Sequence, residues 1–342
     1  MGWLFHSMAC EGQRSQSVGL AENHDRRFIG IARAAKFEIY LERHSRGELS
    51  LNYVVQLLDA FTHEGPNGVH QCLVFELLGP SVDKVLADYH ESHEKLWSET
   101  VLRISIQLLK AVKFIHRAGM CHGDISGRNI AFSCTHLWKQ TEEQLFDVLG
   151  FPEVEPLTRL DGTPLGNGLP SQLVKAAEWV DWIDEDDEDI RLFDFGESFF
   201  QGQEPKKLAQ PGSLRVAWYV NISFLEADIL TISIIDLCFL IHDWPFWYLG
   251  EDEILIFQMI GFVERLPAEW ESKWTSMLKR SSHDLELKED YGTSKLERKF
   301  AGLEPDPTLK PLLHVMKGLM RFLPSSRLTA EDALDLLGKA QE

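Results

Sequence analysis

Two short polar segments, each beside an apolar stretch, constrain this chain more than any other feature of its sequence. The first, CHGDISGRNIAF, covers residues 121–132, and the second, RLFDFGE, covers residues 191–197. Phosphoryl transfer requires a carboxylate at the acceptor hydroxyl and oxygen ligands for magnesium, because positioning and charge neutralisation supply most of that catalysis. Asp124 is the candidate proton acceptor, and Asn129 and Asp194 are the candidate magnesium ligands.

Composition narrows the class of protein further. With 342 residues, 44% of them apolar, the chain can bury a sizeable core as one large domain or as two lobes. Its formal net charge of -19 would repel a phosphate backbone, so we expect no direct nucleic-acid binding and an attraction for basic partners. The five cysteines form no Cys-x-x-Cys pair, which argues against a zinc site or a disulfide framework and favours a reducing cytosol or nucleus.

Membrane and targeting signals are weak. The apolar start, residues 2–10, is short and has no basic flank, which argues against a signal peptide. His6 stands where N-myristoylation requires Ser or Thr. The apolar run 229–241 is interrupted by Asp236 and falls short of the ~20 residues that a span needs. We therefore expect a buried helix over residues 228–241, no membrane association, and a monomer.

The residues before the first motif carry periodic patterns. Apolar spacing predicts a helix over residues 28–44 and strands over 53–61 and 71–77. The intervening HEGPNG, residues 63–68, has the Pro and Asn-Gly composition of a hairpin turn. Residues 1–27 show no clear periodicity.

Two helix starts can be read from capping residues. Ser98 is a plausible N-cap for a helix that runs to about Arg117 and leads into the first motif. Near the end of the chain, Thr329 followed three residues later by Asp332 predicts a capped, amphipathic final helix.

The interval between the two motifs, residues 133–189, is long for a connection inside a compact domain and indicates an insertion. It ends in the strongly acidic run DWIDEDDEDI. Such a run is either a solvated charged surface or a docking surface for basic substrates.

With these motifs in this order, the chain resembles a eukaryotic-type protein kinase, and most closely the SR-protein kinase family as it appears in fungi. The stretches that carry the resemblance are VVQLLDAFTHEGPNGVHQCLVFELLG, HGDISGRNIAF, the insertion, DFGESF and SSRLTAEDAL. The resemblance implies an α+β, two-lobed fold with a truncated or divergent N-lobe and a mainly helical C-lobe. In those terms, residues 1–27 are a divergent segment, 28–78 a partial N-lobe with the hinge, and 79–342 the C-lobe with its insertion.

The resemblance also implies roles for individual residues. Asp124 matches the catalytic base, and Asn129 and Asp194 match the ligands of Mg²⁺ in a site for ATP. Further matches are Glu38, the helix glutamate that pairs with a lysine, Phe75, Glu76 and Leu78 of the gatekeeper and hinge, and the structural residues Asp228 and Arg327. The implied activity is transfer of the γ-phosphate of ATP to Ser or Thr of basic, Arg/Ser-rich proteins.

Several family features are missing. The sequence has no Gly-x-Gly-x-x-Gly and no Val-Ala-x-Lys before Glu38, and Lys36 is too close to replace that lysine. Gly123 and Ser126 occupy positions where kinases usually have Arg and Lys. The Ala-Pro-Glu segment that would supply a glutamate for Arg327 is also not recognisable. These departures predict impaired activity and little control by phosphorylation of the activation loop.

Three interpretations remain open. The first is a serine/threonine protein kinase with a complete catalytic half and an incomplete ATP-binding half. The second is a pseudokinase that binds protein partners as a scaffold. The third is a small-molecule phosphotransferase of the aminoglycoside or choline kinase kind, which shares the His-Gly-Asp and Asn pattern but not Asp228 or Arg327 in their contexts.

Overall fold

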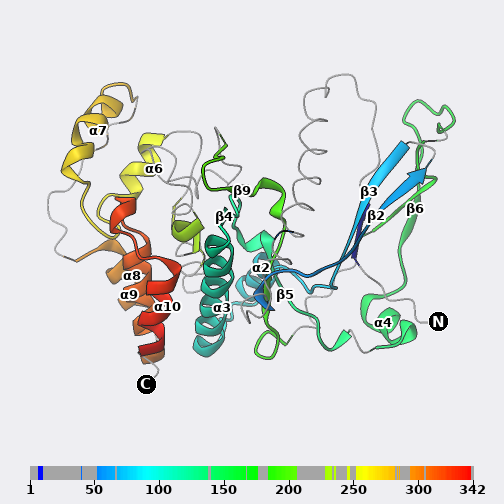
Figure 1. The fold of residues 1–342 in the computed structure, drawn as a ribbon, viewed down its shortest axis with the longest axis horizontal. Helices are drawn as coiled ribbons and strands as arrows, with labels where there is room; N and C mark the ends of the chain where they lie inside the picture. The colour runs from blue at the N-terminus through cyan, green and yellow to red at the C-terminus, as the bar shows by residue number, and fades with distance from the viewer. Residues whose placement is uncertain are drawn as a thin grey trace.

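The computed structural model consists of a helical part and a smaller part built on a twisted antiparallel sheet (Figure 1). Helices α3 and α6 to α10 form the first part, and strands β2 and β3 dominate the second. The structure describes residues 7–10, 40, 52–65, 68–137, 140–166, 168–175, 184–205, 228–232, 235, 245–246, 252–281, 283, 285, 293–303 and 306–339. A two-lobed α+β architecture with a reduced sheet lobe, as expected from the sequence, is confirmed.

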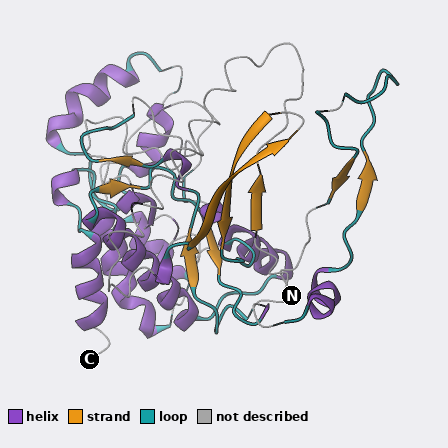
Figure 2. Cartoon of the chain, turned by 45° about the vertical axis from the view of Figure 1, so that its right-hand side comes forward, coloured by secondary structure: helices purple, strands orange, loops and turns teal. Residues whose placement is uncertain are grey.

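The sheet has the order β1-β3-β2, with antiparallel pairs throughout (Figure 2). Its strands are β1 (Ser7–Cys10), β2 (Leu57–Gly65) and β3 (Gly68–Phe75). Pairing of Gly65 with Gly68 confirms the predicted hairpin. Strand β2 begins later than predicted because Asn52 and Tyr53 form a helical turn, and Val54 pairs with Leu192 of another sheet.

The first strand, β1, was not recognised from the sequence. It pairs with β3 on the edge opposite β2, with Ser7 against Phe75 and Cys10 against Cys72. Its four residues, Ser-Met-Ala-Cys, lack the alternation of apolar and polar side chains by which a strand is recognised. Of the helix predicted over residues 28–44, only Tyr40 lies within the described residues, and it is helical.

Helix α3 (Ser98–Arg117) is the central helix of the larger part; it ends where predicted and begins one residue earlier than predicted. Most of its apolar side chains are buried in the main core, from Val101 to Ile115. The predicted N-cap is wrong, because Ser98 is the first helical residue and Trp97 occupies the cap without a side-chain hydrogen bond.

The last helix, α10 (Ala330–Lys339), begins as predicted. The Thr329 hydroxyl oxygen accepts the Asp332 N–H at 3.1 Å, and the Asp332 carboxylate accepts the Thr329 N–H at 3.2 Å. This reciprocal capping box satisfies two backbone donors at the start of the helix. The other helices are α2 (Val82–Ser92), α4 (Glu142–Leu149), α6 (Asp252–Met259), α7 (Glu271–Leu278), α8 (Lys295–Gly302) and α9 (Lys310–Leu319).

Two short antiparallel pairs hold the two sequence motifs against each other. Strand β4 (Met120–Cys121) pairs with β9 (Phe199–Phe200), and β5 (Ile130–Phe132) pairs with β8 (Ile190–Leu192). Because β5 follows the first motif and β8 leads into the second, this pairing brings them together.

The predicted insertion leaves and re-enters the fold at one place. The Ser133 N–H donates to the Asp189 carbonyl at 2.6 Å, directly beyond the β5–β8 pair. Between these ends lie α4 and a hairpin of β6 (Val154–Pro156) with β7 (Gln172–Val174). The division of the chain at residues 27 and 78 stays a prediction.

In the predicted buried helix over residues 228–241, the described residues 228–232 and 235 are helical and buried. None of the helices that the structure describes is both long and apolar enough to cross a membrane.

Candidate active site

A buried carboxylate fixes the backbone in front of Asp124. Asp228 is 0% exposed, and its two oxygens accept the N–H groups of His122 at 2.8 Å and Gly123 at 3.0 Å. The Cys121 thiol donates to the same carboxylate at 3.1 Å. These bonds hold consecutive peptide units of the loop in one conformation, so Asp228 has a structural role, as the resemblance implied.

The charge of Asp228 is itself stabilised. Burial alone would raise its pKa, but the hydrogen bond and charge of His116, with Nε2 at 3.2 Å, and the His122 N–H act the other way. The net pKa lies below the usual value. The carboxylate therefore stays ionised around neutral pH and keeps its acceptor capacity.

Asp124 and Asn129 are in direct contact. The Asn129 amide nitrogen donates to the Asp124 carbonyl at 2.8 Å and to its carboxylate at 3.1 Å. Burial, followed by the charges of Asp194 and Glu197, raises the pKa of Asp124 to about 6, although the Asn129 bond lowers it. A carboxylate with this pKa is a better proton acceptor than an ordinary aspartate and is still ionised at neutral pH.

Asp194 lies beside this pair because of the β5–β8 register. The Phe193 N–H donates to the Asn129 carbonyl at 3.0 Å, which places the two motifs side by side. Asp194 has a left-handed backbone with φ +63°, and its exposed side chain accepts the Gly196 N–H at 3.3 Å. The neighbouring Phe195 is fully buried and anchors the turn. The structure thus brings Asp124, Asn129 and Asp194 together.

His122 connects the two motifs, a role that the sequence analysis did not assign. Its Nε2 lies 3.0 Å from the Phe193 carbonyl, and its Nδ1 accepts the Asp124 N–H at 3.3 Å. Burial lowers the pKa of His122. The neutral imidazole therefore donates through Nε2 and accepts through Nδ1, and so ties Asp124 to the residue before Asp194. Its position directly before Gly-Asp in the motif was the available signal.

Steric crowding explains why glycine occupies position 123, directly before Asp124. Gly123 has φ +78°, and a Cβ there would lie 2.8 Å from the Glu197 carbonyl oxygen and 3.0 Å from the Phe199 ring. Pairing of Cys121 with Phe199 produces this close approach. In this arrangement Glu197 and Phe199, in the segment that follows Asp194, pass too near the loop for a side chain at position 123.

Of the residues predicted to bind the nucleotide, Phe75, Glu76 and Leu78 lie within the described part of the chain. Phe75 and Leu78 are partly buried and pack against the main core, whereas Glu76 is buried. The Glu76 carboxylate is bonded to Arg191 and to the Gln56 N–H, so only its backbone could contact a nucleotide. Glu38 lies outside the described residues. The lysine expected before it is absent from β1, whose residues are Ser-Met-Ala-Cys.

The donor set suits magnesium that is held mainly by phosphate and water. Asp194 offers an exposed carboxylate, and the Asn129 amide oxygen is opposite the nitrogen that binds Asp124. Among the described residues there is no group of three or more His, Cys, Asp or Glu side chains that could hold a metal ion by themselves. Mg²⁺ commonly binds through one or two protein ligands together with substrate phosphates, so these residues fit it.

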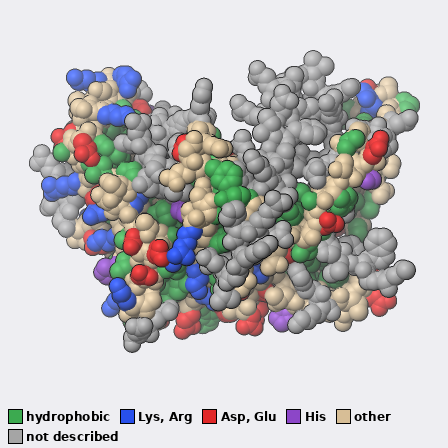
Figure 3. Space-filling model, in the orientation of Figure 1, with side chains coloured by type: hydrophobic (Ala, Val, Ile, Leu, Met, Phe, Trp, Pro, Cys, Tyr) green, Lys and Arg blue, Asp and Glu red, His purple; other side chains and the backbone are tan. Residues whose placement is uncertain are grey.

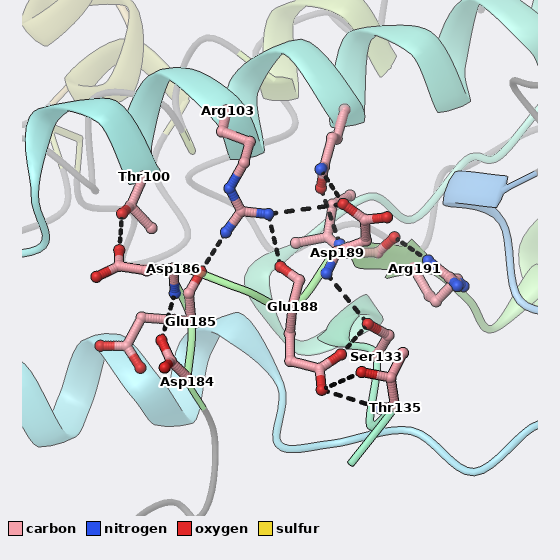
Figure 4. Close-up of polar contacts among 12 residues, drawn as sticks. Thr100, Arg103, Ser133, Thr135, Asp184, Glu185, Asp186, Glu188, Asp189 and Arg191 are labelled. Atoms are coloured by element: carbon pink, nitrogen blue, oxygen red, sulfur yellow. Dashed lines mark hydrogen bonds and ion pairs between the residues drawn. The ribbon is translucent and has the colours of Figure 1, made fainter. Parts of the chain in front are cut away.

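The acidic end of the insertion is bonded to the protein at several points, although Asp184, Asp186 and Asp187 are exposed (Figure 4). We call residues 184–189 the acidic segment. Arg103 of α3 donates to the Glu188 carbonyl at 2.6 Å and also to the Glu185 carbonyl. Its guanidinium lies 3.6 Å from the Asp189 carboxylate.

The side chains of the acidic segment are also engaged. The Glu188 carboxylate is 3% exposed and accepts the Thr135 N–H at 2.9 Å and the Ser133 hydroxyl. Asp186 accepts the Thr100 hydroxyl, and Glu185 accepts the Tyr89 hydroxyl. The segment therefore binds the base of the insertion to α2 and α3, which neither the solvated nor the docking interpretation anticipated.

Comparison with known protein structures identifies the fold. No protein-family model matches the chain. A kinase domain known from a crystal structure superposes on 90% of this chain and 84% of its own length, with a TM-score of 0.55 and 16% sequence identity. The chain has the protein-kinase fold.

Sequence similarity adds a narrower likeness. The protein kinase dsk1 of Schizosaccharomyces pombe is 37% identical over 83 residues, which are 24% of this chain and 15% of dsk1. The serine/threonine-protein kinase SKY1 of Saccharomyces cerevisiae is 39% identical over 83 residues, 24% of this chain and 11% of SKY1. The serine/threonine-protein kinase Kist of Rattus norvegicus is 30% identical over 122 residues, 35% of this chain and 27% of Kist.

These matches confirm the expected resemblance to SR-protein kinase-like kinases. They span less than a third of the length of each relative.

Proposed function

We propose that this chain is a serine/threonine protein kinase that uses ATP and Mg²⁺. The observation that carries the proposal is the contact of Asp124 with Asn129 at 3.1 Å, combined with the bond that holds Phe193, and so Asp194, against Asn129 at 3.0 Å. A proton acceptor and two oxygen ligands at one point are what phosphoryl transfer needs. The kinase fold and the kinase relatives support the same class.

Each residue then has a chemical task. Asn129 and Asp194 would hold Mg²⁺, which when bound would supply neutralisation of the charge on the phosphates. Asp124 accepts the proton of the acceptor hydroxyl, and the bond from Asn129 orients its carboxylate. The backbone from Phe75 to Leu78 holds the adenine.

Basic, Arg/Ser-rich proteins are the proposed acceptors. The support is the net charge of -19 and the similarity to the dsk1 and SKY1 kinases. Action in the cytosol or nucleus is part of the proposal, because the five cysteines of the sequence include no Cys-x-x-Cys pair and form no even disulfide framework.

One observation favours a second candidate, the pseudokinase scaffold. The strand beside β3 carries Ser-Met-Ala-Cys and no lysine to orient phosphates. Misplacing a reacting group by ~1 Å can cost about a hundredfold in rate, so we expect slow transfer even if the metal is bound. The small-molecule phosphotransferase is disfavoured because Asp228 anchors the loop as the protein-kinase resemblance implied.

The test is transfer of radiolabelled phosphate from ATP to an Arg/Ser peptide by the purified chain. We expect slow, magnesium-dependent transfer that falls about 10²- to 10⁴-fold in Asp124→Asn and reaches background in Asp194→Ala. Asp335→Asn, an exposed aspartate of α10, is the matched control and should transfer at the wild-type rate.

Two results would count against the proposal in different ways. Transfer that survives both active-site substitutions would contradict the assigned roles. A chain that binds no nucleotide at any magnesium concentration would instead support the pseudokinase.

A further inference from the structure

A buried ion pair joins the segment proposed to hold adenine to the strand that leads to Asp194. Nε of Arg191 in β8 lies 3.0 Å and 3.2 Å from the two carboxylate oxygens of Glu76, directly after β3. Only 12% of the Arg191 side chain and 5% of the Glu76 side chain are exposed. Because either charge alone would keep its desolvation cost without compensation, these two groups must stay paired.

The polypeptide between the two elements takes part in the same junction. Gln56 donates its N–H to the Glu76 carboxylate at 2.9 Å and accepts the Glu76 N–H at 3.1 Å. One residue earlier, the Val55 N–H donates to the Leu192 carbonyl at 3.0 Å. Residues 54–56 are therefore bonded to the hinge on one side and to β8 on the other.

The Glu76 carboxylate is the centre of this junction, because it contacts both the Gln56 backbone and the Arg191 side chain. Burial raises the pKa of Glu76, and the Arg191 guanidinium acts to lower it. The ionised form thus depends on Arg191, and loss of either charge would release the hinge from β8.

The location of the pair gives it a consequence for ligands. Glu76 lies between Phe75 and Leu78, the proposed adenine segment, and Arg191 precedes Asp194 by three residues. A nucleotide with its metal must contact both ends at once, so its affinity depends on the separation of the two ends being fixed in advance. A nucleoside that contacts only the hinge does not depend on that separation.

We propose that Glu76 and Arg191 are positioning residues that fix the adenine segment relative to the magnesium ligand Asp194. The inference rests on the proposed function and deepens it, because it assigns the geometry of the nucleotide site to two side chains that touch neither adenine nor metal.

The experiment compares the dissociation constants of adenosine and of Mg-ADP by titration calorimetry for the wild type and for Glu76→Gln. Glutamine removes the charge but keeps an oxygen for the Gln56 N–H. We expect Mg-ADP binding to weaken by about tenfold and adenosine binding by no more than about twofold, since a coupling of sites typically changes affinity by roughly 5- to 150-fold.

Two more variants separate this effect from damage to the fold. Arg191→Lys keeps the charge but loses the Nε donor. It should weaken Mg-ADP binding selectively, as Glu76→Gln does, but by a smaller factor. The double variant Glu76→Gln with Arg191→Gln leaves neither partner of this pair as an unpaired buried charge, so it should fold, as judged by circular dichroism. Its affinity for Mg-ADP should still fall, with little change in its affinity for adenosine.

The chain offers a matched control. Glu264 also accepts an arginine, Arg321, at 2.6 Å and a backbone N–H, that of Phe322, at 2.7 Å, but outside the nucleotide region. Glu264→Gln should bind both ligands like the wild type. Equal losses for both ligands in Glu76→Gln, or no loss, would overturn the inference and leave the proposed function standing. A wild-type chain that binds neither ligand would contradict the proposed function, and the inference with it.

Discussion

At the scale of single residues, the raised pKa of Asp124 sets the pH dependence of the proposed activity. Burial and the charges of Asp194 and Glu197 bring this pKa to about 6. Below it the carboxyl is protonated and cannot accept the hydroxyl proton, so kcat/KM should rise as the pH passes through about 6 and level off above 7. Initial rates measured from pH 5 to 8 at saturating magnesium would show this limb.

The contribution of Asp124 to the free energy of unfolding should vary with pH in the opposite sense to the rate: it should fall as the pH rises. The folded pKa is above the ordinary value of 3.8, so Asp124 contributes stability that is present below about pH 4 and is lost as the pH rises through 6. Asp124→Asn should therefore raise the free energy of unfolding by about 1 kcal/mol at pH 7, after discounting for solvent screening, and by less near pH 4. An unchanged pH profile in this variant would assign the rate limb to another group.

Residue types alone were enough to propose a proton acceptor and metal ligands, because the chemistry of phosphoryl transfer dictates which side chains can serve. They could not give the pKa of Asp124, which arises from burial and from charges 70 or more positions away along the chain, at Asp194 and Glu197. They also missed His122, since a histidine in a loop can equally be solvated. Its role appears only when Phe193 is placed beside it.

At the scale of elements, the acidic segment acts as an internal connection. Arg103 of α3 is bonded to the carbonyls of Glu185 and Glu188 and paired with Asp189, where the insertion rejoins β8. Arg103→Met would remove these charge-assisted bonds and leave partly buried acceptors without their arginine partner. We expect the free energy of unfolding to fall by about 2 kcal/mol and protease cleavage within the insertion to become faster.

Arg128 offers the comparison for that experiment. Its side chain is 84% exposed and its Nε lies 3.4 Å from Asp83. Arg128→Met should change stability by no more than about 0.5 kcal/mol, because exposed pairs contribute little. If the two methionine variants unfolded at the same denaturant concentration, the acidic segment would not be held by Arg103.

Helices with an amphipathic pattern or a capping sequence could be predicted from the sequence, whereas strand β1 and the contacts of the acidic segment could not. The amphipathic pattern gave α3 with its start displaced by one residue, and the Thr329 and Asp332 pair gave the start of α10. Strand β1 has no such pattern and is defined by its pairing with β3. The acidic segment looked solvated because composition does not reveal that α2 and α3 present hydroxyl and guanidinium donors to it.

At the scale of the whole molecule, the order of the motifs was enough to predict the protein-kinase fold, because each motif occupies a fixed place in it. The Glu76–Arg191 pair could not be predicted, since the two residues are 115 positions apart and neither belongs to a motif that specifies a partner. Long-range contacts of this kind depend on how β3 and β8 approach each other, which local sequence does not encode.

Net charge is the remaining property of the whole molecule, and it bears on the proposed acceptors. Figure 3 shows the acidic side chains of the described residues spread over the visible face among basic and uncharged ones, not gathered in one patch. Several carboxylates of the acidic segment are already bonded internally, including Glu188 and Asp186. Attraction of a basic peptide should then come from the overall field of a chain with net charge -19 rather than from this segment.

The association of an Arg/Ser peptide should therefore weaken as salt rises, because ions screen charges beyond ~8 Å at physiological ionic strength. We expect the association rate to fall roughly tenfold between 50 and 300 mM salt, measured by stopped-flow fluorescence with a labelled peptide. Asp187→Asn, which removes an exposed charge of the acidic segment, should change the rate less than twofold. A rate indifferent to salt would contradict electrostatic attraction altogether, whereas a large effect of Asp187→Asn alone would restore the acidic segment as the docking surface.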